Sequence, residues 1–199
     1  MLSSIIIVII MRSAKRERGA RIFLGIDIPE NIRKKIREAM NYYDKYLERV
    51  VPEENWHITL LFLGNVDRYS YYLSRIANDL RCPFLLTVSM LYLGRGLKGS
   101  QLWAYVEKNN SLINARKELG ERVKKARMPV SVDLPKIQEG NNFVPHVRVG
   151  DMLKTTQGRG IADRPVAGTF APKTVNIYRS ELVDGLPKYF IEHKINVVS

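Results

Sequence analysis

Two short segments of the same design, HITL at 57–60 and HVRV at 146–149, constrain the fold of this chain more than any other feature of its sequence. Successive side chains of a β-strand leave opposite faces, so each segment predicts a strand with a polar pair on one face and aliphatic side chains on the other. The polar pairs are His57 with Thr59 and His146 with Arg148. The 89 residues between the two histidines suit equivalent strands in two lobes that face each other across a cleft.

Strand-like and helix-like patterns are interleaved along the rest of the chain. Period-two alternation and runs of β-forming residues predict strands at 21–29, 56–64, 84–93, 101–107, 143–150, 175–183 and 188–198. Apolar residues every three or four positions predict helices from Pro29 to near Val50, over 68–80 and over 111–126, and 150–172 is predicted mainly as loop. Hairpin signals at 94–100 and at Asp184 and Gly185 favour an α+β fold over an all-parallel sheet.

The composition narrows the classes of scaffold and partner. A length of 199 residues, with 45% hydrophobic and 26% charged residues, is typical of a globular protein with one compact domain or two small lobes. The formal net charge of +12 favours polyanionic partners, with nucleic acid first among them. A single cysteine and three histidines exclude a disulfide scaffold and a zinc finger.

Residues 1–20 differ from the rest of the chain. Their apolar run, 5–11, is far shorter than the ~20 residues that a membrane span needs, and a basic cluster follows it, whereas in a secretory signal the basic residues come first. We therefore expect a cytoplasmic protein. The segment is interpreted as an N-terminal extension, either the product of an upstream start codon, since Met11 could itself begin the chain, or an added edge strand.

Two opposed histidines can divide an acid–base reaction between them. With an unperturbed pKa near ~6.5, one imidazole can serve as base while the other, protonated, serves as acid. Phosphoryl transfer requires proton removal, proton donation and neutralisation of the charged oxygens between them. Either histidine alone is adequately explained as a hydrogen-bonded strand residue, so the pair carries the inference.

Several segments resemble a known family. HITL and PHVRV are similar to the two H-x-[ST]-x signatures of the two-histidine (2H) phosphoesterases. RIFLGIDIP, NWHITLLFLGNV and the closing IYRSELVDGLPKYF resemble the RNA 2′,3′-cyclic phosphodiesterase branch, also called 2′-5′ RNA ligase or LigT-like proteins. The resemblance extends from Arg21 to about Val198.

The resemblance implies an α+β fold with two lobes related by a pseudo-twofold axis, in which two antiparallel sheets flank a central cleft and helices lie outside. Residues 21–199 would form this single bilobal domain. The implied activity opens a terminal 2′,3′-cyclic phosphate on RNA to a 2′-phosphate, and some members also join tRNA halves through a 2′-5′ linkage without ATP. No cofactor, metal or membrane association is expected, and we expect a monomer.

The signatures also imply roles for individual residues. His57 and His146 would be the acid and the base, with His57 preferred for protonating the departing 3′ oxygen and His146 for activating water. Thr59 would donate a hydrogen bond to a phosphate oxygen. Arg148 stands where the family usually has Thr or Ser, and Asp151 where related sequences often have Arg. Either the Arg148 guanidinium replaces both functions, or its bulk leaves a protein that only binds RNA ends.

Other residues are candidates for RNA contacts outside the signatures. They are Arg95 and Lys98 in the 94–100 loop, and Lys124 and Lys125 in the basic run 122–127, which could equally be a solvated helix end. Phe23 either stacks on a base or packs in the core, and Trp56 and Trp103 are interpreted as core or lobe-interface residues. A small cyclic nucleotide stays open as an alternative substrate.

Overall fold

A computed structural model describes residues 19–81, 83–96, 99–130, 143–156 and 160–198. The predicted edge strand in the N-terminal extension and the candidate Lys98 lie outside these ranges. In the described part of the chain, no helix is both long enough and apolar enough to cross a membrane.

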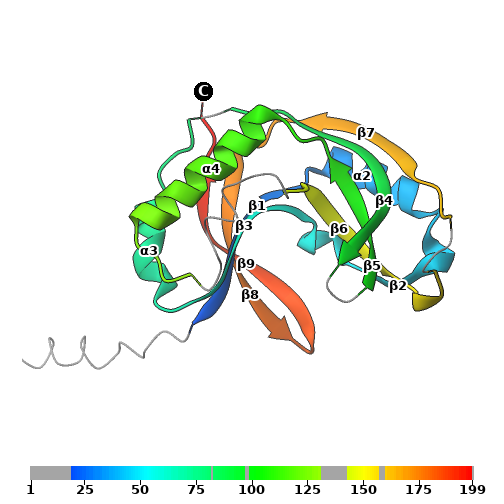
Figure 1. The fold of residues 1–199 in the computed structure, drawn as a ribbon, viewed down its shortest axis with the longest axis horizontal. Helices are drawn as coiled ribbons and strands as arrows, with labels where there is room; N and C mark the ends of the chain where they lie inside the picture. The colour runs from blue at the N-terminus through cyan, green and yellow to red at the C-terminus, as the bar shows by residue number, and fades with distance from the viewer. Residues whose placement is uncertain (1–18, 82, 97–98, 131–142, 157–159, 199) are drawn as a thin grey trace, which may run out of the picture.

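Nine strands of the described residues form one sheet in the order β7-β4-β5-β6-β3-β1-β8-β9, with β2 paired to β6, and every pairing between them is antiparallel (Figure 1). The strands are β1 (Ala20–Asp27), β2 (Leu47–Val50), β3 (His57–Val66), β4 (Leu86–Gly96), β5 (Gly99–Val106), β6 (His146–Met152), β7 (Arg164–Phe170), β8 (Thr174–Val183) and β9 (Leu186–Asn196). The helices are α2 (Glu30–Met40), α3 (Tyr69–Ile76) and α4 (Asn110–Lys125). Helix α2 packs against β4 and β7, α4 packs against β3, and α3 packs against α4. The expected α+β class is confirmed.

The two halves of the sheet meet at a single residue pair. Strands β3 and β6 pair only at Ile58 and Val147, both fully buried. These are the central residues of the two signatures, so an approximate twofold axis through this pair would exchange His57 with His146. The two expected sheets are therefore joined here into one, which corrects that part of the prediction.

The first predicted helix is too long. Helix α2 ends at Met40, and the residues expected to continue it to near Val50 form a turn and strand β2. Tyr43 is fully buried without belonging to the helix, and its hydroxyl, with one hydrogen to donate, lies 3.1 Å from the carbonyl oxygen of Leu91 and 2.9 Å from that of Ala162. The helical spacing of apolar residues continues past the helix because Tyr43 is buried and Leu47 packs against the core without being helical.

The stretch 150–172 is not mainly a loop. Strand β6 continues to Met152, and β7 pairs along the edge of β4. The sequence of β7, RPVAGTF, lacks a strong β pattern, so its conformation depends on the pairing with β4. Strands β4 and β5 also extend farther into the 94–100 loop than expected, to Gly96 and from Gly99.

The predicted hairpin at Asp184 and Gly185 is confirmed. Val183 pairs with Leu186, and the two residues between them have φ angles of 52° and 77°. Two positive φ values define the tight turn that matches the twist of a hairpin, and glycine adopts them without strain. The hairpin of β8 and β9 extends beyond the rest of the sheet (Figure 1) and carries Leu186 toward the site described next.

Candidate active site

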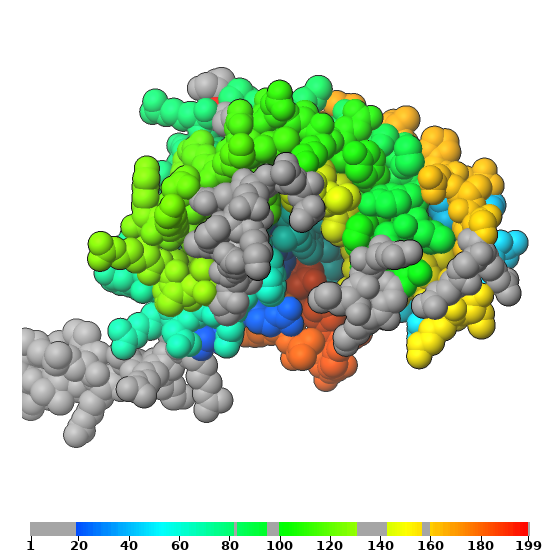
Figure 2. Space-filling model, viewed as in Figure 1, coloured from blue at the N-terminus to red at the C-terminus, as the bar shows by residue number. Residues whose placement is uncertain are grey.

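A pocket of about 330 Å³ lies where β3, β6 and the β8–β9 hairpin meet. Figure 2 shows the surface hollowed between the yellow and green strands on one side and the orange-red hairpin on the other, with teal β3 on its floor. The pocket is lined by Arg49, Val50, Val51, Pro52, Asn55, His57, Thr59, His146, Arg148, Leu186, Pro187 and Tyr189. It brings together all four polar residues of the two signature strands.

The two histidines have matching hydrogen bonds in the two halves. Nδ1 of His57 lies 2.7 Å from the carbonyl oxygen of Asn55, and Nδ1 of His146 lies 2.8 Å from that of Val144. A carbonyl oxygen only accepts, so each Nδ1 carries the hydrogen and each Nε2 is left for proton transfer. Nε2 of His57 is 3.0 Å from the hydroxyl oxygen of Thr59.

Burial lowers the pKa of both imidazoles. The pKa of His57 falls to about 4, although the bond to the Asn55 carbonyl and the negative charge of Asp27 favour the protonated ring. Burial also lowers the pKa of His146, and the positive charge of Arg148 adds to this effect. At neutral pH both rings are therefore neutral in the unliganded protein. A bound phosphate anion would raise both pKa values toward the range in which one ring donates a proton.

Aromatic side chains enclose His57. The ring of Phe23 lies 4.7 Å, between centroids, from His57 and stacks at the same distance on Tyr178. Tyr189 meets the imidazole edge-on at 5.1 Å. Only 4% of Phe23 is exposed, which leaves no face of its ring for a base. The suggestion that Phe23 stacks on RNA is thus corrected, and the core alternative holds.

Trp103 contacts His146 rather than filling the core. The two rings stack with centroids 3.8 Å apart and planes 15° apart. The indole lies flat over Gly94 of the neighbouring strand, where a Cβ atom would sit 2.1 Å from a Trp103 ring carbon. The indole is therefore held between Gly94 and His146. Sequence reasoning missed this role, because only the β4–β5–β6 register brings the three residues together.

Gly94→Ala tests this stack. The added methyl group must displace the indole and with it the His146 ring, so we expect kcat in phosphoester hydrolysis to fall by roughly 10- to 100-fold. Tryptophan fluorescence should change at the same time. Gly160→Ala is the matched control, because a Cβ atom there meets nothing within 4 Å. Unchanged fluorescence and turnover in Gly94→Ala would show that the stack does not position His146.

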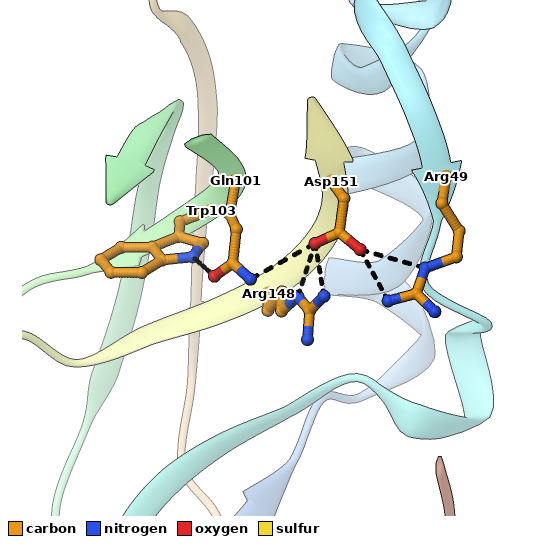
Figure 3. A network of polar contacts seen from close by, with 5 residues as sticks. All are labelled: Arg49, Gln101, Trp103, Arg148 and Asp151. Atoms are coloured by element: carbon orange, nitrogen blue, oxygen red, sulfur yellow. Dashed lines mark hydrogen bonds and ion pairs between the residues drawn. The ribbon is translucent and has the colours of Figure 1, made fainter. Parts of the chain in front are cut away.

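Asp151 links several polar residues beside the pocket (Figure 3). It accepts hydrogen bonds from Arg148, Arg49 and Gln101, and Gln101 in turn accepts one from the Trp103 indole. Although burial alone would raise the pKa of Asp151, the hydrogen bonds from the two arginines outweigh it and hold the pKa below its usual value. The network therefore joins Arg148 to the residue that stacks on His146.

Arg49 is a pocket residue that sequence reasoning missed. The helix predicted from Pro29 to near Val50 includes it, and that prediction gives no reason to place it near the signatures. In the structure it lies on β2 opposite Asp151, and its side chain reaches that carboxylate. One feature of the sequence could have indicated such a residue, namely the acidic Asp151 beside the second signature. A half-buried carboxylate needs a cationic partner, and Arg49 is one of those that it has.

The remaining RNA candidates lie outside the pocket. Lys124 and Lys125 are exposed at the end of α4, whereas Arg122 of the same run donates to the backbone carbonyls of Asn78 and Asp79 and has a structural role. Arg95 belongs to β4, but its side chain, like the whole of Lys98, is outside the described part of the structure. Contacts of these lysines and of Arg95 with RNA stay predictions.

Paired strands that bring two histidines, each tied through Nδ1 to a backbone carbonyl, and an arginine to one pocket define a phosphoesterase of the two-histidine class. The comparisons with known proteins agree. The model of the family described as LigT like Phosphoesterase matches residues 26–93. A Methanocaldococcus jannaschii protein named RNA 2′,3′-cyclic phosphodiesterase is 30% identical over 181 residues, covering 85% of this chain and 96% of the relative. The chain belongs to the LigT-like phosphoesterase family.

Further relatives extend the match. A Thermotoga maritima protein, also named RNA 2′,3′-cyclic phosphodiesterase, is 32% identical over 143 residues, covering 65% of this chain and 68% of its own. A Thermus thermophilus structure matches with a TM-score of 0.69 at 20% identity, over 89% of this chain and 97% of that one. E. coli LigT complexed with 3′-AMP matches with a TM-score of 0.67 at 22% identity, over 92% of this chain and 99% of its own. At these identities the two structures support the fold alone.

Proposed function

We propose that this protein is an RNA 2′,3′-cyclic phosphodiesterase that opens a terminal 2′,3′-cyclic phosphate to a 2′-phosphate. The observation that carries the proposal is the matching pair of histidines, each tied through Nδ1 to a backbone carbonyl and lining one pocket with Arg148. The names of the M. jannaschii and T. maritima relatives support the same substrate.

In the proposed reaction one imidazole accepts a proton from water as the water oxygen bonds to phosphorus. The bond from phosphorus to the 3′ oxygen breaks, and the other imidazole gives its proton to that oxygen. The product has a 2′-phosphate and a free 3′-hydroxyl. Arg148 and Thr59 neutralise and bind the oxygens that carry negative charge in the transition state.

We assign the acid to His57 and the base to His146. Burial acts on both rings, but the nearby charges differ: Asp27 favours the protonated form of His57, and Arg148 favours the neutral form of His146. In the free protein burial lowers the pKa of His57 further than that of His146, so this assignment requires that bound phosphate compensate for the burial of His57 and move the proton preference to it.

The partners follow from the same proposal. We propose a monomer that acts on RNA ends, with tRNA fragments among them, in the cytoplasm and without metal or organic cofactor, because two imidazoles and a guanidinium supply each proton and charge that the reaction needs. The net charge of +12 would favour an RNA over an uncharged substrate.

Hydrolysis of a short oligonucleotide with a 2′,3′-cyclic phosphate end tests the proposal directly. We expect a 2′-phosphate product, identified by ³¹P NMR. A folded wild-type protein that binds the oligonucleotide and leaves the ring closed would support the RNA-end-binding alternative instead. Turnover of cyclic mononucleotides with no turnover of cyclic-ended RNA would support the small-substrate alternative.

The pH dependence should reflect the lowered histidine pKa values. Catalysis needs one protonated and one neutral ring, and in the free protein this state is most populated between the two lowered pKa values. We therefore expect kcat/KM to peak below pH 6.5, the ordinary histidine pKa, and kcat to peak at higher pH because bound phosphate favours protonation. A kcat/KM that rises steadily from about pH 6 to about pH 8 would contradict this expectation.

A further inference from the structure

Two arginines from different strands meet at one carboxylate. Arg49 lies directly opposite Asp151 in the β2–β6 pairing. Arg148 precedes Asp151 by three residues, a spacing that places side chains on opposite faces of a regular strand. The register between β5 and β6 shifts between Trp103 and Leu102, so that Val149 is an extra residue and Asp151 turns to the face of Arg148.

Each guanidinium uses one edge for this contact. Arg49 donates from Nε, at 3.0 Å, and from Nη2, at 2.6 Å, to Oδ2 of Asp151. Arg148 donates from Nε, at 3.1 Å, and from Nη2 to Oδ1. Of the five N–H groups of a guanidinium, three therefore remain for another acceptor on each arginine. Figure 3 shows the two guanidiniums next to each other, each at its own oxygen of the Asp151 carboxylate.

The charge of this cluster suits anionic ligands. Two guanidiniums face one carboxylate, which leaves one positive charge uncompensated within the group. The side chains of Arg49 and Arg148 are 44% and 37% exposed, whereas that of Asp151 is 20% exposed. Solvent, and hence a ligand, reaches the cations more readily than the anion between them. Because both arginines also line the pocket, the free edges are available to a substrate there.

Each arginine has enough free donors for a phosphate of its own. The three N–H groups that each guanidinium keeps allow a bidentate contact with a separate anion. Two phosphate groups, one at each guanidinium, would therefore use both free edges. Only Arg148 belongs to a signature strand with a histidine, so the reacting phosphate belongs at Arg148 and the second phosphate at Arg49.

We propose that Arg49 forms a second phosphate subsite, which binds the phosphodiester joining the terminal nucleotide to its 5′ neighbour. The inference rests on the proposed function and deepens it. It makes Arg49 a specificity-determining residue, one that favours RNA chains over mononucleotides as substrates. Val50, Val51 and Pro52, which follow Arg49 in the chain, line the same pocket as Leu186 and Pro187, and these apolar side chains offer a surface for the nucleoside between the two phosphates. Asp151 then acts as a positioning residue that sets the separation of the two cations.

The test compares two substrates with the same cyclic-ended nucleoside, a mononucleotide and a dinucleotide. Arg49→Ala should lower kcat/KM for the dinucleotide by roughly 10- to 100-fold, the range expected for hydrogen bonds to a charged group, and change it less than about twofold for the mononucleotide. Arg49→Lys, which keeps the charge but loses the fork of donors, should fall between Arg49→Ala and wild type. Arg81→Ala, at an exposed arginine that does not line the pocket, is the control and should change neither value.

An equal loss on both substrates in Arg49→Ala would overturn the proposal, because Arg49 would then act on the reacting phosphate or through Arg148. No loss on either substrate would overturn it as well. If the wild-type protein hydrolyses neither substrate, the proposed function fails, and the subsite is judged by calorimetry with the corresponding 2′-phosphate products. A preference for the dinucleotide product that Arg49→Ala abolishes would support the subsite, and equal affinities in wild type would overturn it.

Discussion

His146→Ala will lower hydrolysis of a 2′,3′-cyclic phosphate end by roughly 100- to 10,000-fold, the range in which general acid–base groups contribute, and His57→Ala will do the same. Each substitution removes an Nε2 that the proposed reaction needs for one of its two proton transfers. Because the two transfers belong to one reaction, the double variant should be little slower than either single variant. Rates are measured by product formation from an oligonucleotide at saturating concentration.

The control for loss of a histidine is His193→Ala. His193 is exposed on β9, does not line the pocket and should leave the rate unchanged. Affinity for the cyclic-ended oligonucleotide should change little in His57→Ala and His146→Ala, because Arg148 still binds the phosphate. Retained binding would also show that both variants are folded. Rates within about tenfold of wild type in both variants would refute acid–base catalysis by this pair.

Arg148→Thr will lower kcat by roughly 100- to 1,000-fold, which is the usual cost of removing one group that stabilises transition-state charge. The substitution restores the residue that the family usually has at this position, so it separates the two explanations of Arg148. If the guanidinium replaces the usual hydroxyl and the usual arginine at 151, its loss removes both functions. If the guanidinium only crowds the site, Arg148→Thr should raise the rate.

A double variant is the matched test. Arg148→Thr combined with Asp151→Arg restores the arrangement common in related sequences, and we expect it to recover a large part of the activity lost in Arg148→Thr. Asp151→Arg alone would set a third guanidinium beside Arg49 and Arg148, and should be poorly active because the carboxylate that holds them is gone. An Arg148→Thr variant at least as active as wild type would disprove the replacement hypothesis.

Most of the strands and helices could be predicted from local pattern, and the exceptions share a cause. Strands β1, β3, β6, β8 and β9 lie near their predicted positions, and α4 nearly matches its prediction. Strands β2 and β7 were missed because each depends on a partner strand far away in the sequence: β2 on β6, and β7 on β4. Periodicity alone cannot supply such pairing, and in 41–50 it favours a longer helix over the observed turn and strand.

The sequence by itself determined which face of each signature strand is polar, because alternation is a property of the extended backbone and needs no tertiary contact. It therefore predicted His57, Thr59, His146 and Arg148 as candidates. Only the tertiary structure decided what surrounds them: the pairing of Ile58 with Val147 that joins the two halves, the stack of Trp103 on His146, and the contacts of Arg49 and Arg148 with Asp151. These depend on strand register and on one extra residue in β6, which are set by packing between segments up to about a hundred residues apart.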